Sequence, residues 1–306
     1  MVNRILIRIK VVQIVYSYLK GDKDMNATEK ELFFSLEKAY DLYHYLLLLM
    51  IEVTDLQKKR LDTAKAKYMP SAEDLNPNTR FVDNRFIQQL RNDPQLAEYT
   101  TQQKLSWVNE SDFVKSLLDE ILASEAYAKY MESAEDSYEA DREFWRNVFK
   151  NIIIPNQFLA DVLEDQSLYW NDDMDIIGTF VVKTIKKYEQ NPTTEQLLPM
   201  FKDSEDSEFA KKLFRRSVLD ATKLQKLIEN NTKNWDIERI AFMDNVIMIV
   251  ALAEILSFPS IPVKVSLNEY IEIAKAYSTQ RSGKFINGIL DGVVSRLKKD
   301  GEINKD

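Results

Sequence analysis

The chain has 306 residues, of which 45% are hydrophobic and 29% charged, with no cysteine and one histidine. This length and composition predict a globular protein of one large domain or two ordinary ones. The absence of cysteine excludes disulfides, thiolate metal sites and cysteine nucleophiles, and suits a reducing cytoplasm. A lone histidine, His44, excludes a His–His metal pair, and its place in a helical run favours a packing or surface role.

The net charge of −8 is unevenly distributed along the sequence. Residues 1–20 carry four basic groups and no acidic group, and residues 281–299 carry five basic groups against Asp291. Residues 110–175 carry seventeen acidic groups against five basic ones. Two basic ends therefore flank an acidic middle, a pattern compatible with solvated helix faces or with nucleic-acid contact at the ends.

Apolar residues recur at helical spacing in almost every segment, and no segment predicts a strand, so we expect an all-α protein. The first helix is predicted over residues 2–19. Arg4 and Arg8 lie one turn apart and share a face, and Lys10 points to another side. The face predicted to be buried comprises Ile5, Ile9, Val12 and Tyr16.

A second helix is predicted from Thr28 to about residue 67. The sequence TEKE at its start has the spacing of a capping box, with Thr28 and Glu31 as partners. Two prolines in MPSAEDLNPNTRF end this helix. Further helices are expected near 84–91, 94–105, 111–132, 137–153, 156–164 and 173–188, and, after a linker at 190–199, near 206–230, 236–257, 262–278 and 283–299.

The sequence contains no pattern typical of an enzyme. Phosphate-binding and dinucleotide-binding loops need clustered glycines after a strand, and neither is present. Carboxylate pairs such as Asp172 with Asp173, and Asp203 with Glu205, lie in polar sequence, which favours surface charge over acid–base catalysis. We therefore expect a protein that is not an enzyme and that needs no cofactor or metal.

The C-terminal region contains an ordered series of motifs. Trp235, Arg239, Asp244 and Glu254 precede IPVKVSLNEYIEIAKAY and KFINGILD. This order resembles the NusB family of bacterial transcription antitermination factors, whose signature has a proline, a valine, Asn-Glu, Ala-Lys and Phe-Val-Asn-Gly-Val-Leu-Asp. The corresponding residues here are Pro262, Val265, Asn268, Glu269, Ala274, Lys275 and Phe285 to Asp291, with Ile286 and Ile289 in place of the valines.

The N-terminus matches the same family more loosely. An arginine-rich helix leads into Gln-x-Leu-Tyr in the family, and here Arg4, Arg8 and Lys10 lead into QIVY, with Gln13 and Tyr16 matching. The resemblance thus covers residues 1–20 and 206–299, a basic N-terminal helix and the C-terminal helices. Residues 21–205 are expected to be mostly an acidic helical insertion, and residues 300–306 a tail.

The resemblance implies a fold of two small helical bundles that share a core. It also implies binding of single-stranded boxA-like RNA from ribosomal RNA leaders, together with the ribosomal protein NusE, within an RNA polymerase elongation complex that reads through terminators. No membrane partner is expected. The residues that the resemblance and the charge pattern assign to RNA binding are Arg4, Arg8, Lys10, Arg281, Lys284 and Phe285.

Two alternatives stay open at this point. Phe285 could belong to the core or form a stacking platform for a base. The chain could also be a protein-interaction scaffold that keeps the NusB-like core without RNA binding. Gly288 and Gly292, four residues apart, are expected to form a small-residue stripe that allows close helix packing and presents Lys284 and Phe285, with Gly283 in irregular backbone before the helix.

Overall fold

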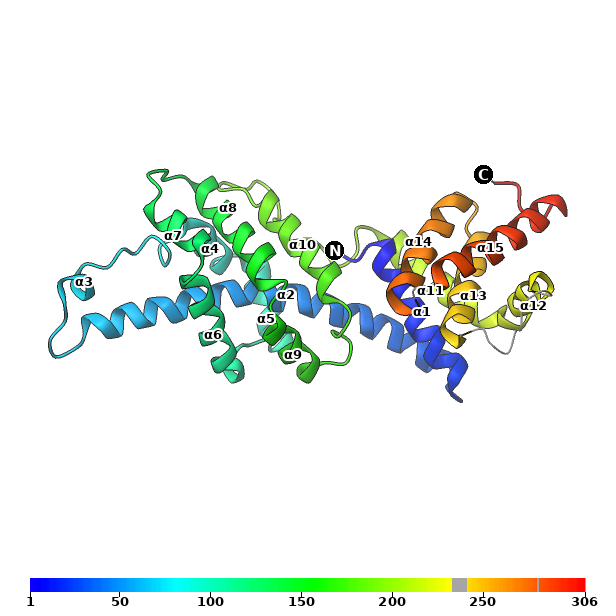
Figure 1. The fold of residues 1–306 in the computed structure, drawn as a ribbon, viewed down its shortest axis with the longest axis horizontal. Coiled ribbons are helices and arrows are strands. Elements are labelled where there is room, and N and C mark those ends of the chain that lie inside the picture. Colours follow the sequence, from blue (N-terminus) through cyan, green and yellow to red (C-terminus); the bar gives the residue numbers. More distant parts are fainter. Residues whose placement is uncertain (233–240, 280, 306) are drawn as a thin grey trace. The chain divides into compact units, whose positions relative to one another are not determined.

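The computed structural model describes residues 1–232, 241–279 and 281–305, and the chain forms two compact units. Unit 1 comprises Met1 and residues 37–200, and unit 2 comprises residues 2–36 and 201–306. Helix α2 (Met25–Lys65) contributes residues to both units (Figure 1). The described residues form helices and one isolated parallel β-bridge between Val2 and Phe201, which confirms the all-α prediction. None of the described helices is long and apolar enough to cross a membrane.

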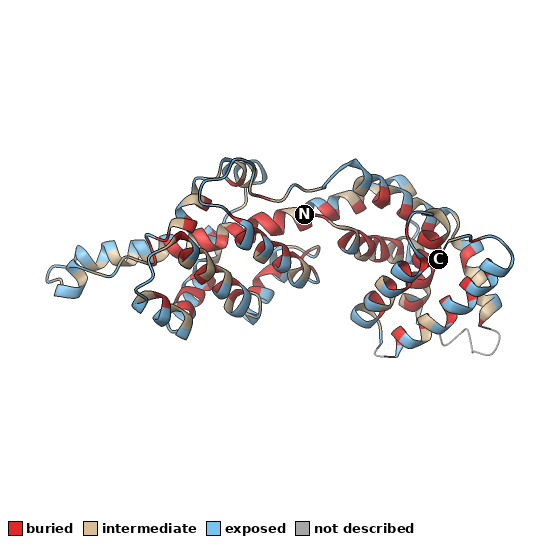
Figure 2. Ribbon diagram, turned by 90° about the horizontal axis from the view of Figure 1, so that it is seen from above, coloured by how far each residue is buried: buried red, intermediate tan, exposed pale blue. Residues whose placement is uncertain are grey.

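Unit 2 is built around α13 (Phe242–Ser257), in which every residue from Val246 to Ile255 is buried (Figure 2). A helix that is apolar on every side needs neighbours on every side. Five helices of the unit contact α13: α1 (Arg4–Lys20), α11 (Ser204–Leu219), α12 (Ala221–Asn231), α14 (Val263–Tyr277) and α15 (Ser282–Lys299).

Unit 1 packs shorter helices against the later part of α2. Tyr43 shares a hydrogen bond of 2.6 Å with Thr184, and the indole N–H of Trp107 donates to the Tyr45 carbonyl at 2.9 Å. Helix α8 contacts α4, α7 and α10. The elements after α2 are α3 (Ala72–Leu75), α4 (Arg85–Arg91), α5 (Pro94–Gln103), η1 (Val108–Glu110), α6 (Ser111–Leu122), α7 (Glu125–Glu132), α8 (Tyr138–Val148), the π-helical turn η2 (Phe149–Ile153), α9 (Gln157–Gln166) and α10 (Met174–Lys187).

Three predicted helices differ in their bounds. The segment 111–132, predicted as one helix, forms two helices. The Ser124 hydroxyl accepts from the Tyr127 amide and starts the second one. The prediction over 206–230 is also two helices, divided at Asp220. Helix α2 starts before Thr28, because the Asp24 carboxylate accepts from the Ala27 amide at 2.8 Å. Aspartate caps a helix at least as well as threonine. The helix therefore begins at Met25, directly after Asp24, and not at Thr28.

The buried face of α1 differs from the predicted one. Ile5 is 42% exposed, whereas Arg8 is 3% exposed and Lys10 is 2% exposed. The apolar residues of α1 that the core buries are Leu6, Ile7, Val11, Val12, Ile14 and Val15. A pattern that assigns charged residues to the surface therefore selects the wrong face when a charged residue has a buried partner.

The buried partner of Arg8 is Glu254 of α13, which is fully buried. Arg8 Nε donates to Glu254 Oε2 at 2.8 Å and Nη2 donates to Oε1 at 2.9 Å, a bidentate pair. The Ser266 and Tyr270 hydroxyls of α14 donate to the same carboxylate at 2.7 and 2.9 Å. Burial, followed by the charge of Glu254, raises the pKa of Tyr270 well above its ordinary value, so the phenol stays a donor. These contacts join α1, α13 and α14.

We predict that Arg8→Met lowers the free energy of unfolding by about 3–5 kcal/mol, because it leaves the Glu254 charge buried without a counter-charge. The double variant Arg8→Met/Glu254→Gln should lose less, since the neutral amide still accepts from one of the Ser266 and Tyr270 hydroxyls and donates its NH2 group to the other. Urea unfolding followed by circular dichroism measures both.

The matched control is Arg4→Met, which removes an arginine of the same helix whose side chain is 39% exposed. This change should alter the free energy of unfolding by at most about 1 kcal/mol. An Arg8→Met variant as stable as the Arg4→Met variant would show that the buried pair does not support unit 2.

Candidate nucleic-acid interface

A buried carboxylate fixes the connection between α14 and α15. Asp244, in the first turn of α13, is 5% exposed. One of its oxygens accepts from the Ser278 hydroxyl at the end of α14, and the other accepts from the Ser282 hydroxyl at the start of α15 at 2.9 Å. The Thr279 amide donates to the Ser282 hydroxyl at 3.2 Å. The direction in which α15 begins is therefore set by the core of unit 2.

This start of α15 presents three of the residues predicted to bind RNA. Arg281 and Lys284 are exposed, and neither forms an ion pair with any residue that the structure describes. Phe285 is half-buried, which is compatible both with a place in the core and with stacking on a base. Two unpaired cations can contact phosphates, and the aromatic ring beside them can stack on a base.

The glycines of α15 do not form the expected packing stripe. A Cβ added at Gly288 would meet nothing within 4 Å, and one at Gly292 would meet only Asn231 Oδ1 at 3.7 Å. The close approach is instead at Gly283, inside the first turn of α15, where a Cβ would stand 3.2 Å from Lys275 Cγ and 3.6 Å from Ile271 Cγ2. Gly283 thus allows α15 to start against α14, whereas Gly288 leaves bare helix backbone one turn after Lys284.

The predicted basic residues of α1 occupy different environments. Arg8 and Lys10 are buried, so we assign them to the packing of unit 2 and not to RNA contact. The guanidinium of Arg4 lies 3.5 Å from Asp206, 3.9 Å from Glu205 and 5.1 Å from the Phe209 ring centre. Arg4 is accessible, but a phosphate would have to compete with two carboxylates. The Trp235 and Arg239 positions of the family motif lie outside the described residues.

Sequence reasoning missed a second cationic and aromatic cluster in unit 2. Lys20 Nζ donates to the Tyr16 hydroxyl at 2.8 Å and lies 5.8 Å from the centre of the Phe242 ring. The Tyr16 and Phe242 rings meet edge to face with centres 5.0 Å apart, and Phe242 is 37% exposed. The signal that could have found this cluster is the i, i+4 spacing of Tyr16 and Lys20, since Tyr16 belongs to the matched QIVY motif.

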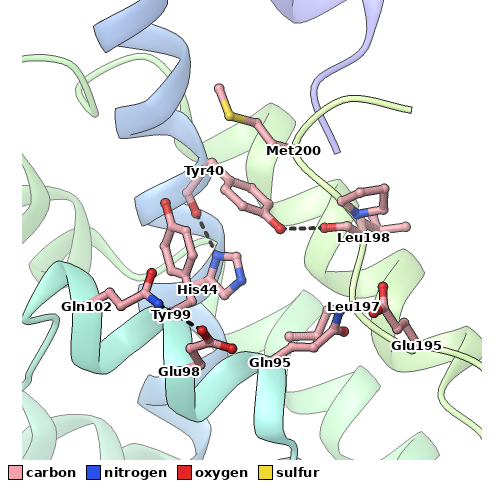
Figure 3. A pocket seen from close by; sticks show the side chains of 11 residues that line it. Tyr40, His44, Gln95, Glu98, Tyr99, Gln102, Glu195, Leu197, Leu198 and Met200 are labelled. Atoms are coloured by element: carbon pink, nitrogen blue, oxygen red, sulfur yellow. Dashed lines mark hydrogen bonds between the residues drawn. The ribbon is translucent and has the colours of Figure 1, made fainter. Parts of the chain in front are cut away.

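Unit 1 contains a cavity of about 280 Å³ between α2, α5 and residues 195–200 (Figure 3). His44 stacks on Tyr99 with ring centres 3.9 Å apart, and its Nδ1 bonds to the Tyr40 carbonyl at 2.9 Å. A carbonyl only accepts, so Nδ1 carries the proton. Tyr40 and Tyr99 donate to the Leu198 carbonyl and to Asp41, respectively. These groups hold α2, α5 and the segment at 198 together, and we assign them to packing.

The fold and this surface define an all-helical protein whose unit 2 carries cations beside aromatic rings at the start of α15 and at Tyr16. The family model described as NusB family matches residues 173–295. The protein named transcription antitermination protein NusB from Salinibacter ruber is 39% identical over 132 residues, which are 41% of this chain and 82% of that protein. The chain therefore belongs to the NusB family.

Two more relatives bear the same name. The protein from Chloroherpeton thalassium is 33% identical over 40% of this chain and 58% of its own length. The protein from Methylacidiphilum infernorum is 41% identical over 30% of this chain and 64% of its own length. A solved structure of T. maritima NusB is 24% identical, covers 53% of this chain and 97% of its own, and has a TM-score of 0.31.

We predict that Gly288→Ala raises the free energy of unfolding by about 0.5–1 kcal/mol, because alanine favours the helix and its methyl group meets open space. Gly283→Ala should gain less, since its Cβ would press on the Lys275 side chain. Thermal unfolding compares the two variants. A Gly288→Ala protein less stable than wild type would contradict the open surface at this residue.

A second prediction concerns pH. Burial lowers the pKa of His44 to about 4 from its ordinary value of 6.5. Between these values the unfolded chain binds a proton that the folded protein does not, so stability falls as pH drops from 6.5 to 4, by about 3 kcal/mol. Urea unfolding followed by tryptophan fluorescence reports mainly on unit 1, which holds Trp107, Trp145 and Trp170.

The matched variant is His44→Phe, which keeps an aromatic ring against Tyr99 but does not titrate. Its stability should fall less than that of wild type over the same pH range, since only the carboxylates common to both proteins respond. Equal losses in the two proteins would show that His44 titrates normally in the folded state.

Proposed function

We propose that this chain is an RNA-binding transcription antitermination factor of the cytoplasm that acts by binding and not by catalysis. In this proposal it binds single-stranded boxA-like RNA with the ribosomal protein NusE and helps an RNA polymerase elongation complex to read through terminators. Membership of the NusB family supports this role, since its relatives are named transcription antitermination protein. The observation that carries the RNA contact is the start of α15, where Arg281 and Lys284 are exposed beside Phe285.

The physical basis is the combination of charge and ring at a fixed site. Phosphate contacts by lysine and arginine supply much of the affinity for nucleic acid, and aromatic stacking adds about 1–3 kcal/mol per base. Asp244 holds the start of α15 in place, so the backbone that carries these side chains needs little ordering on binding. The bare backbone at Gly288 leaves room for a strand to approach the same helix face.

The N-terminal helix contributes less in this proposal than the resemblance implies. Arg4 supplies one accessible cation, and Tyr16 with Lys20 supplies a second place where a base and a phosphate could bind. Arg8 and Lys10 would act only by holding α1 in the core. The RNA contact would therefore depend on α15 more than on α1.

The alternative function is a protein-interaction scaffold that keeps the NusB-like core without RNA binding. The observation that favours it is the burial of Arg8 and Lys10, which removes two of the six predicted RNA contacts from the surface. Unit 1, residues 37–200, would then carry the interaction. The two functions differ in a direct binding measurement.

The test is fluorescence anisotropy with a short boxA-like single-stranded RNA, titrated across salt. Lys284→Ala should flatten the slope of log K against log salt by about 0.7, the effect of one phosphate contact on a single strand. Phe285→Ala should weaken binding by about 1–3 kcal/mol and leave the slope nearly unchanged. Circular dichroism checks that the Phe285→Ala protein is folded, because this ring is half-buried.

Lys298→Ala is the matched control, since Lys298 is an exposed lysine near the other end of α15. It should leave the affinity and the slope unchanged. If the wild-type protein binds no RNA at low salt, even with the ribosomal partner added, the scaffold function is favoured.

A further inference from the structure

The end of α2 carries a basic cluster within the unit that contains the acidic middle of the chain. Residues 58–67 include five basic residues and one acidic residue, Asp62. Residues 110–175 have the opposite balance, with seventeen acidic groups against five basic ones. Figures 1 and 2 show the last turns of α2 reaching past the other long helices of unit 1, with exposed residues around them. Of the helices of unit 1, α6 and α3 each place one carboxylate, Asp119 and Asp74, against this basic end.

Three of the five cations are available to a partner. Arg60 pairs with Asp119 at 2.5 Å, and Lys67 pairs with Asp74 at 3.1 Å. Lys58, Lys59 and Lys65 are exposed and form no ion pair with any residue that the structure describes. Lys58 and Lys65 are seven residues apart, so they lie on one face about 10 Å from each other along the helix axis.

Two large side chains next to these lysines are left in solvent. Tyr68 is 100% exposed and Met69 is 82% exposed, directly after the end of α2. Tyr68 forms no ring contact or hydrogen bond with the described part of the chain. Single apolar residues are common on surfaces, but a fully exposed tyrosine beside three unpaired lysines joins the two chemistries that bind single-stranded nucleic acid.

We propose that residues 58–69 form a second contact surface for single-stranded RNA, which we name the α2-end surface. Lys58, Lys59 and Lys65 contact phosphates, and Tyr68 stacks on a base. This inference rests on the proposed function, because single-stranded RNA is the ligand that the proposed function assigns to the chain. RNA fits the surface better than an acidic protein does, since a free aromatic face serves a base directly.

The test compares two RNAs with the full-length protein: the short boxA-like RNA and the same RNA extended by unpaired nucleotides. The extended RNA should bind wild type more tightly than the short one. In Lys58→Ala/Lys59→Ala/Lys65→Ala this gain should disappear, and the salt slope for the extended RNA should flatten by about 2, or about 0.7 for each of three phosphates. Tyr68→Ala should weaken binding of the extended RNA about 5- to 150-fold with an unchanged slope.

The matched control is Lys183→Ala/Lys186→Ala/Lys187→Ala, which removes the same charge from exposed lysines of α10 in the same unit. It should keep the gain from extension. All substituted side chains are exposed, so the variants should fold as wild type does, and their thermal unfolding checks this.

The outcomes separate the two proposals. Failure of wild type to bind the short RNA overturns the proposed function. The α2-end surface is overturned if extension adds no affinity in wild type, or if the α10 control loses as much affinity as the α2 variant. It is also overturned in favour of a membrane if anionic phosphatidylserine vesicles, and not RNA, distinguish wild type from the α2 variant.

Discussion

The buried pair between Arg8 and Glu254 is the interaction on which the arrangement of unit 2 depends. A bidentate ion pair in the core tolerates little displacement, because each charge is far from water and needs its partner. Ser266 and Tyr270 saturate the remaining acceptor sites of the carboxylate. The pair therefore fixes α1 and α14 against α13, and it decides which face of α1 is buried.

A second buried carboxylate of α13 fixes the start of α15. Asp244 is held by two serine hydroxyls from either side of the α14–α15 connection. Its buried carboxylate costs free energy unless both oxygens find donors, so the connection is constrained. One acidic residue of α13 thus orders the core, and another orders the surface that carries Arg281 and Lys284. The stability of unit 2 and the RNA contact that we propose for it depend on the same central helix.

Two glycines of α15 differ in their surroundings: Gly283 lies against α14, and Gly288 lies at the open surface. Gly283 allows the close approach of α14, because a Cβ there would stand 3.2 Å from Lys275 Cγ. Gly288 has no such neighbour, although glycine weakens a helix. In the function that we propose, Gly288 leaves room for RNA at the face of α15 that Lys284 shares.

The sequence by itself determined the helical class and the family motifs, because helical periodicity and motif order are local properties of the chain. It also located the start of α15 as a cationic and aromatic segment. Only the tertiary structure decided that Arg8 and Lys10 are buried, that Ile5 is exposed and that Tyr16 meets Phe242. These outcomes depend on partners far away in sequence, such as Glu254 for Arg8. A charge pattern read along one helix does not contain the position of its counter-charge, so the fold alone separates a core arginine from one that can reach RNA.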